Sequence, residues 1–206
     1  LSQQIYGFIV DEIRFGNLAL GQKIDEGELI SKLSTSRTPI REALIQLSAD
    51  GILVNVPRKG FFVKDLNEKT LRDVTDIIAC LDFYGLKKAI PQLQDEDYVH
   101  MYKIIDEVDS AIEERDYSKY CLLTDRFHGY YYHASGNESL PATITSIENQ
   151  CVRHTYFNQD QEKLYGTLKE VNQEHRKILE LAAKNDLPAL EKLIFFHWTK
   201  IVPGMW

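Results

Sequence analysis

Cysteine is scarce in this sequence, and its few positions exclude two kinds of structure. The three cysteines, Cys80, Cys121 and Cys151, lie far apart and form no CxxC pair. An odd number of widely spaced cysteines argues against a disulfide framework and against a cysteine zinc site. We therefore expect the protein to work in a reducing cytoplasm.

Long apolar runs are missing as well. No run approaches the roughly 20 residues with which a helix spans a bilayer. The first residues also lack the basic and then apolar layout of a signal peptide. The sequence contains no HExxH segment, and no carboxylate is clearly placed as a general base. We expect neither a membrane protein nor an enzyme.

The charge of the chain is unevenly distributed. The 206 residues carry a formal net charge of −7, which is unfavourable for binding nucleic acid. Between residues 31 and 64, however, six cations stand against two anions, a local net charge of +4. Counterion release and steering depend on charges within a Debye length, about 10 Å, of the phosphates. This segment is therefore the candidate for contact with nucleic acid.

Residues 36–47 predict a short amphipathic helix at the centre of that segment. Its apolar residues follow the i, i+3, i+4, i+7 spacing of one helical face, at Ile40, Ala43, Leu44 and Leu47. Ser36 suits the N-cap, and Pro39 is tolerated in the first turn. Arg37, Thr38 and Arg41 are left on the exposed front, where they suit phosphates and guanine edges in a major groove. An ordinary solvated helix has the same pattern, so the flanking segments decide between the two.

Those flanks predict a winged helix-turn-helix. Residues 1–15 read as a helix, and the Asp-x-x-Glu spacing of Asp25 and Glu28 opens a second one that ends at Leu33. After residue 51 the pattern changes to a hairpin, with strands over 52–56 and 61–64. Its turn carries Arg58 and Lys59, so the hairpin predicts a basic wing that reaches the DNA backbone or minor groove.

The remainder of the chain predicts helices only. Their expected ranges are 70–90, 95–115, 117–135, 139–158, 163–185 and 187–202. The fold class is thus mostly α, with a winged helix-turn-helix over residues 1–66. An all-α helical bundle follows over residues 67–206, and residues 65–67 link the two domains.

Three histidines are candidate metal ligands in this bundle. His175 and His197 lie at equal distances from the predicted turn at Asn185 and Asp186. In an antiparallel helix pair such residues reach the same height, so the two imidazoles could face each other. His128 on an earlier helix could complete a site for zinc, nickel or manganese. Taken singly, a histidine is more often a surface residue or a satisfied core residue than a metal ligand.

Residues 1–66 resemble the winged helix-turn-helix domain of GntR-type bacterial transcription regulators. The resemblance rests on Gly16, Gly21, Leu29, Leu33, the run Ser36 to Leu44, Leu47, Gly51, and residues 57–60. It implies that Arg37, Thr38 and Arg41 read DNA and that Lys59 and Gly60 belong to the wing. One departure is Gly27, where many members carry a charged residue that contacts phosphate.

Residues 67–206 resemble the FCD-type ligand-binding domain of the fatty-acid-regulator (FadR) branch of that family. The matching motifs are Phe127-His128, Gly136-Asn137, Glu174 to Leu179, Asn185-Asp186 and His197. The resemblance implies that His128, His175 and His197, normally with an aspartate, bind a divalent metal whose coordination a small carboxylate effector completes.

The aspartate position of that motif is occupied by Thr124 in this chain. Asp125 is adjacent, but it is rotated by about 100 degrees around the helix. Arg153 lies where the resemblance implies an arginine paired with the effector, which suits a carboxylate through two parallel hydrogen bonds. A surface arginine is the alternative. Tyr131 is a further candidate for the effector pocket, although aromatic runs such as residues 130–132 usually lie in the core.

These observations predict a cytoplasmic, sequence-specific DNA-binding transcription regulator, most simply a repressor. We expect a homodimer on a near-palindromic operator of double-stranded DNA, with affinity set by a small carboxylate effector in the helical domain. Two alternatives stay open. The metal itself could be the signal, or the histidines could form a metal-dependent hydrolase fused to a DNA-binding domain.

Overall fold

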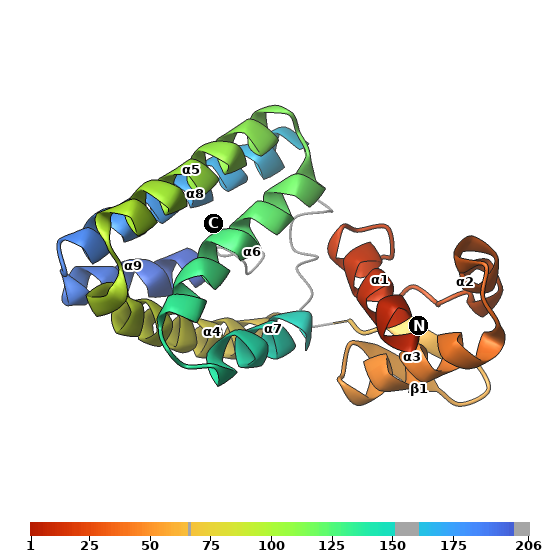
Figure 1. Ribbon diagram of the computed structural model, residues 1–206. Coiled ribbons are helices and arrows are strands. Elements are labelled where there is room, and N and C mark those ends of the chain that lie inside the picture. Colours follow the sequence, from red (N-terminus) through yellow and green to blue (C-terminus); the bar gives the residue numbers. More distant parts are fainter. Residues whose placement is uncertain (66, 151–160, 200–206) are drawn as a thin grey trace. The chain divides into compact units, whose positions relative to one another are not determined.

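The computed structural model describes residues 1–65, 67–150 and 161–199. The chain forms two compact units (Figure 1). The first holds Leu1–Asn67, and the second holds Glu68–Ile147 together with the described residues from 161 onward. Arg153 lies outside the described residues.

The first unit contains the predicted helices and hairpin. Their order is α1 (Ser2–Arg14), α2 (Glu26–Leu33), α3 (Arg37–Ala49), β1 (Leu53–Val56) and β2 (Gly60–Val63). The predicted apolar stripe of α3 is buried: Ile40, Leu44 and Leu47 are each 0% exposed. It packs against α1, whose Ile9 and Ile13 are also 0% exposed. Burying one such side chain stabilises the fold by about 1.5–3 kcal/mol, so this contact fixes the orientation of α3.

The two helix starts in this unit are built differently. Asp25 caps α2, since its Oδ1 accepts hydrogen bonds from the backbone N–H groups of Gly27 and Glu28 at 2.8 and 3.0 Å. Ser36 occupies the N-cap position of α3 as predicted, but its hydroxyl makes no capping hydrogen bond. The third helical residue is Pro39, which has no N–H to donate. One of the two usual partners of a capping hydroxyl, the N–H of the third helical residue, is therefore absent.

The wing is a tight antiparallel hairpin. Leu53 pairs with Val63 and Val56 pairs with Gly60. The turn is closed by the N–H of Lys59, which donates to the carbonyl of Val56 at 3.0 Å. Arg58 adopts a φ of 65°, in the left-handed region. This turn, with Pro57 at its first central position, places the two basic side chains at the tip.

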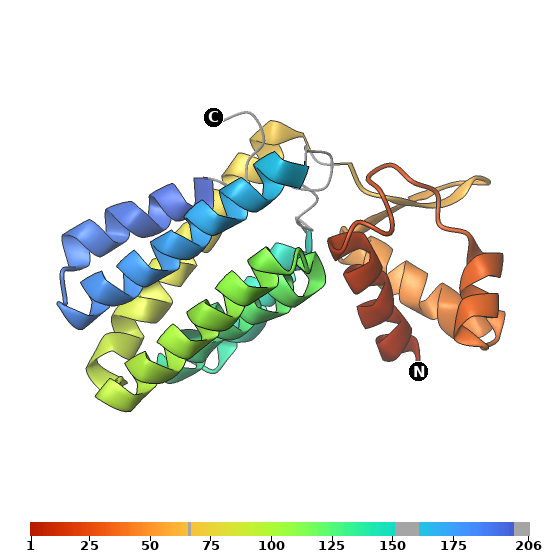
Figure 2. The ribbon, with the colours of Figure 1, turned by 90° about the horizontal axis from the view of Figure 1, so that it is seen from above.

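The second unit is helical throughout its described residues (Figures 1 and 2). It comprises α4 (Glu68–Ala89), the short 3-10 helix η1 (Ile90–Gln92), α5 (Asp95–Glu113), α6 (Tyr117–Ala134), α7 (Ser139–Gln150), α8 (Gln161–Ala183) and α9 (Leu187–Thr199). The sequence predicted all of these except η1. The predicted continuations of α7 to residue 158 and of α9 to residue 202 lie outside the described residues.

Five of these helices close a ring around one core. Helix α4 packs on α6, α6 on α5, α5 on α8, α8 on α9, and α9 back on α4. Large side chains that are at most 1% exposed fill the centre, among them Phe127, Tyr131 and Trp198. None of the described helices combines the length and apolarity that crossing a bilayer requires. Because the ring is closed, α4, α6, α8 and α9 each turn one face toward the shared core.

Candidate functional site

The predicted DNA-reading residues lie together on the surface of the first unit. Arg37, Thr38 and Arg41 are exposed on α3, opposite its buried stripe. A surface groove runs between this helix and the wing, lined by Arg41 and Ile45 from α3, Asn55 and Val56 from β1, Arg58 to Phe61 from the wing, and Glu26. The structure thus brings Arg41, Arg58, Lys59 and Gly60 to one concave surface.

Glu26 also lines this groove, and no sequence pattern had marked it as a site residue. Its Oε2 lies 3.1 Å from Nε of Arg41. The Arg41 side chain is 60% exposed, so this ion pair contributes little to stability. Its effect is orientation, because Glu26 holds the guanidinium at the edge of the groove.

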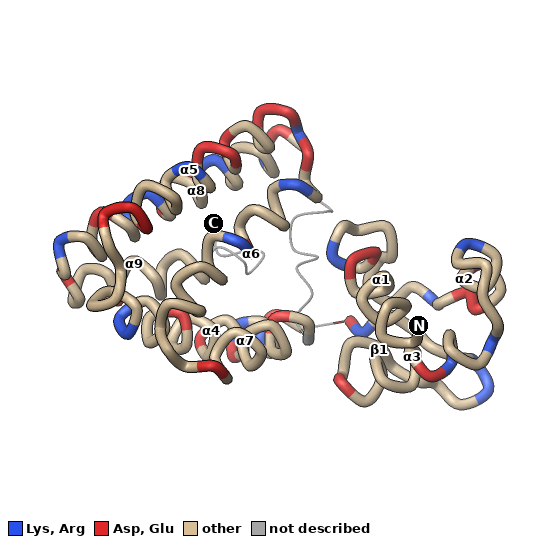
Figure 3. Tube along the Cα trace, viewed as in Figure 1, with Lys and Arg blue, Asp and Glu red and all other residues tan. Residues whose placement is uncertain are grey.

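The charges of the two units differ as the sequence suggested. Figure 3 shows acidic residues along α5, which carries seven acidic side chains and a single cation, Lys103. The basic residues of α3 and the wing belong to the first unit. The negative net charge of the chain is therefore compatible with a basic DNA-facing surface.

The three predicted histidines form a buried cluster in the second unit. One ring nitrogen from each of His128, His175 and His197 lies within 4.8 Å of the other two. The rings of His175 and His197 are 4.8 Å apart between centroids, so the contact expected from their equal spacing about the turn is confirmed. All three side chains are nearly inaccessible, at 4%, 1% and 4% exposure in sequence order. Among the described residues, this is the single group of histidine, cysteine or acidic residues placed to hold a metal ion.

A carboxylate orients the His197 ring. Nδ1 of His197 lies 3.0 Å from Oε2 of Glu174, which is 5% exposed. Burial lowers the pKa of His197, and it outweighs the opposing hydrogen bond with Glu174. The ring is therefore neutral, with its proton on Nδ1 toward the carboxylate.

A second carboxylate, Asp82 on α4, stands behind His128. Asp82 is 0% exposed, and it accepts hydrogen bonds from Tyr131 OH at 2.5 Å and from Trp198 Nε1 at 2.6 Å. Tyr131 OH also lies 2.5 Å from Nδ1 of His128. Because the hydroxyl donates its proton to Asp82, it accepts the Nδ1 proton of His128.

The ionisation state of the Asp82 carboxylate follows from the same contacts. Burial raises its pKa, but interactions with His128 and the hydrogen bonds from Tyr131 and Trp198 together hold the pKa below its ordinary value. The carboxylate is thus ionised. The same burial and the Asp82 charge raise the pKa of the Tyr131 hydroxyl well above its ordinary value, so the hydroxyl keeps its proton.

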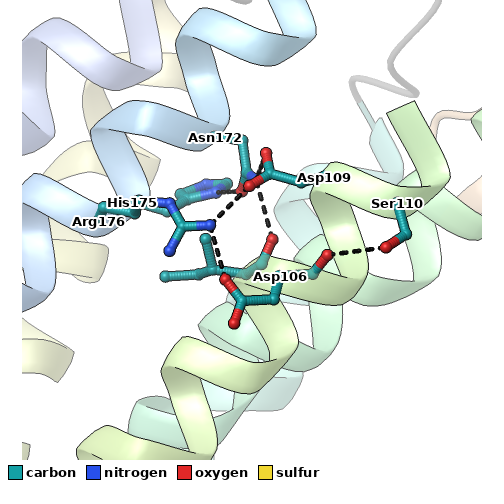
Figure 4. Close-up of polar contacts among 7 residues, drawn as sticks. Asp106, Asp109, Ser110, Asn172, His175 and Arg176 are labelled. Atoms are coloured by element: carbon teal, nitrogen blue, oxygen red, sulfur yellow. Dashed lines mark hydrogen bonds and ion pairs between the residues drawn. The ribbon is translucent and has the colours of Figure 1, made fainter. Parts of the chain in front are cut away.

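An amide orients the His175 ring (Figure 4). Asn172 donates from Nδ2 to the carbonyl of Ile105 at 3.0 Å and to Asp109 at 2.6 Å. Its Oδ1 therefore faces Nδ1 of His175, 3.1 Å away. Arg176 in turn pairs with Asp109 at 2.6 Å. This chain of contacts between α5 and α8 fixes the His175 ring.

All three histidines thus use Nδ1 for a supporting contact, so Nε2 of each is the ring nitrogen whose lone pair can bind a metal. Neutral imidazoles whose second nitrogen is held by a carboxylate, hydroxyl or amide are the usual ligands of zinc and related metals. The donor set of this cluster therefore fits a divalent metal ion.

The other predicted site residues have mixed outcomes. Thr124 is 1% exposed, and its hydroxyl donates to the carbonyls of Tyr120 and Cys121 in its own helix. Tyr131 is buried as a support of His128, and its part in effector binding stays a prediction. Asp82 was missed, because nothing in the local pattern of α4 marks it. Its contacts with Tyr131 and Trp198 span 49 and 116 residues of sequence.

Comparison with known proteins agrees with both halves of this structure. Residues 1–63 match the gntR family of bacterial regulatory proteins, and residues 73–199 match the FCD domain. The Nta operon transcriptional regulator of Aminobacter aminovorans is 32% identical over 130 residues, which span 63% of this chain and 61% of that protein. The HTH-type transcriptional repressor RspR of Escherichia coli K12 is 22% identical over 98% of this chain and 87% of its own length.

Solved structures share the fold. The E. coli McbR/YncC structure superposes with a TM-score of 0.80 at 18% identity, over 97% of this chain and 93% of its own. This likeness concerns the fold, and the matches over both units place the sequence. The chain belongs to the gntR family of bacterial regulatory proteins, and it is a DNA-binding transcription regulator with an FCD domain behind its winged helix-turn-helix.

Proposed function

We propose that this protein is a cytoplasmic, homodimeric repressor whose affinity for its operator is set by a small carboxylate effector. The groove between α3 and the wing is the observation that carries the DNA-binding part, because it gathers Arg41, Arg58 and Lys59 on one exposed surface. The name of RspR as a repressor supports the direction of regulation.

The operator is a near-palindromic duplex in this proposal. A two-fold dimer presents two copies of α3, so it reads two half-sites related by the same symmetry. Arg37, Thr38 and Arg41 contact base edges and nearby phosphates in the major groove. Arg58, Lys59 and the backbone of Gly60 contact the sugar-phosphate backbone, which positions the domain without reading sequence.

The helical domain holds the effector through a divalent metal, zinc, nickel or manganese. Nε2 atoms of His128, His175 and His197 would hold the ion, which when bound supplies a positively charged anchor for a carboxylate. Thr124 and Arg153 remain our candidates for further contact with the effector, and Tyr131 acts through His128. The effector changes operator affinity only if it binds the DNA-competent and DNA-incompetent arrangements with different affinities.

The DNA-reading part is tested by fluorescence anisotropy on an operator selected from random duplexes. Arg37→Ala and Arg41→Ala should each lose about 1–3 kcal/mol of discrimination between the operator and random duplex. Lys59→Ala should weaken binding to the operator and to random duplex alike. The slope of log affinity against log salt concentration should become smaller by about one. Arg72→Ala, an exposed arginine on α4, is the matched control and should bind like the unmodified protein. Unchanged discrimination in both α3 variants would refute the assignment.

A further inference from the structure

We propose that Asp82 and Glu174 together balance the charge of the bound metal from behind the histidines, in place of a carboxylate ligand supplied by the chain itself. This inference rests on the proposed metal site. It makes both acids positioning residues, which act through His128 and His197.

The need for such charges follows from the donor set. Three neutral imidazoles carry no charge, and a divalent cation in a site this buried is costly unless anions lie close to it. Thr124, one helical turn before His128 on the same face, offers a neutral hydroxyl that is already bonded to its own helix. The balancing charge must therefore come from elsewhere.

The first anion is Asp82. It reaches the cluster from α4, a helix that contributes no histidine to it. Both of its oxygens are held by neutral donors, Tyr131 OH and Trp198 Nε1, and Oδ1 lies 3.7 Å from Nδ1 of His128. Neutral donors stabilise the anion without cancelling its charge, so the field of the carboxylate reaches the histidine cluster.

The second anion is Glu174, which faces Nδ1 of His197 directly at 3.0 Å. The third ring differs, since His175 is supported by the neutral amide of Asn172. Behind that amide, Asp109 is paired with Arg176 at 2.6 Å, so its charge is offset. Two buried carboxylates therefore stand behind the cluster, one behind His128 and one behind His197. A carboxylate behind a metal-binding histidine also raises the basicity of the ligand nitrogen.

The experiment measures zinc affinity of the full chain by competition with a chromophoric chelator. Asp82→Asn and Glu174→Gln keep the shape of each side chain and one of its two oxygen acceptors, and they remove its charge. In Asp82→Asn the amide NH2 replaces one of the two oxygens that accept from Tyr131 OH and Trp198 Nε1. Each should weaken zinc binding by about 10- to 100-fold. Asp97→Asn is the matched control. Asp97 also accepts a hydrogen bond from a tyrosine hydroxyl, that of Tyr130 at 2.5 Å. It is only half-buried, and its other hydrogen bond comes from the backbone of Gln94, so its variant should keep the original affinity.

A charge effect is separated from a loss of shape by rescue. Adding Thr124→Asp to Asp82→Asn returns a carboxylate to the site, now as a ligand candidate, and should restore zinc affinity. The absorption spectrum of bound cobalt should stay that of the unmodified protein in Asp82→Asn and change when Thr124→Asp is added. Weakened binding that Thr124→Asp does not restore would mean that Asp82 holds only the shape of the site, and would overturn the proposal.

The remaining outcomes distinguish this inference from the metal site itself. If the unmodified protein binds zinc, His175→Ala loses it, and both carboxylate variants bind within twofold of the original, the metal site stands and the charge-balance proposal falls. If the unmodified protein binds none of zinc, nickel and manganese, both fall. Should Asp82→Asn not fold, as judged by circular dichroism, Glu174→Gln alone decides the matter.

Discussion

Arg58 combines an unfavourable backbone conformation with a useful position. Its φ of 65° lies in the left-handed region, where a residue with a Cβ is less stable by roughly 1–2 kcal/mol. Glycine would adopt this turn without that penalty. Residues held in such conformations concentrate at functional sites. The wing tip therefore gives up stability to place a guanidinium at the edge of the groove between α3 and the wing.

This trade-off predicts opposite effects of one substitution. Arg58→Gly should raise the free energy of unfolding of the winged domain by about 0.5–1 kcal/mol, the relieved strain less the unfolded-state entropy of glycine. The same variant should bind operator DNA more weakly, because the contact of the Arg58 side chain with the sugar-phosphate backbone of the DNA is lost. Urea unfolding and anisotropy measure the two effects. Arg58→Ala should lose the affinity without gaining stability, and a loss of stability in Arg58→Gly would contradict the assigned turn.

Single residues also show where sequence-based prediction reaches its limit. His175 and His197 could be paired from sequence, because equal distances from one turn place them at the same height on adjacent helices. Asp82 could not be found in this way, since its partners lie 49 and 116 residues away and only the closed ring of helices brings them together. Local periodicity carries no record of such contacts.

At the level of elements, the packing of α4 depends on Gly85. A Cβ at this position would lie 2.8 Å from Cδ2 of Leu140 on α7 and 3.1 Å from Cδ1 of Tyr132 on α6. Both neighbours are buried, at 3% and 5% exposure, so neither can move freely. The absence of a side chain here lets α4 approach the two helices closely.

Gly85→Ala should therefore destabilise the helical unit by about 1–3 kcal/mol, although alanine is the better helix former. Gly166→Ala in α8 is the matched control, because among the described residues nothing beyond its own stretch of helix lies within 4 Å of the added Cβ. It should leave stability unchanged or raise it by up to about 1 kcal/mol. Urea unfolding of both variants decides the matter. Equal stabilisation by both would show that α4 does not pack this closely.

The elements themselves were more predictable than their ends. Helical periodicity and the change to a hairpin after residue 51 are local signals, and the structure has the expected helices and strands. Helix α4, however, starts at Glu68 rather than at the predicted Thr70. The start of a helix depends on which backbone groups find partners in the fold, and the apolar pattern does not record this.

At the scale of the whole molecule, the chain contains two units with separate cores. A chain of this kind need not unfold in one step. A ligand that binds the native state of one unit stabilises that unit by mass action, by about 2.7 kcal/mol when its free concentration is 100 times its Kd. Because the three histidines all belong to the helical unit, metal should act on this unit alone.

We therefore expect calorimetry of the chelator-treated protein to show two transitions, of which zinc at 100 times its Kd shifts only one. His175→Ala should abolish this shift, since it removes one of the three Nε2 ligands. Lys59→Ala, on the wing, should retain it. The shifted transition is assigned by Gly85→Ala, which lowers the unfolding temperature of the helical unit only. A zinc shift that survives in His175→Ala would place the ion elsewhere. A shift of the other transition would mean that zinc binds the winged domain, and a metal-anchored effector could then not act through the helical ring.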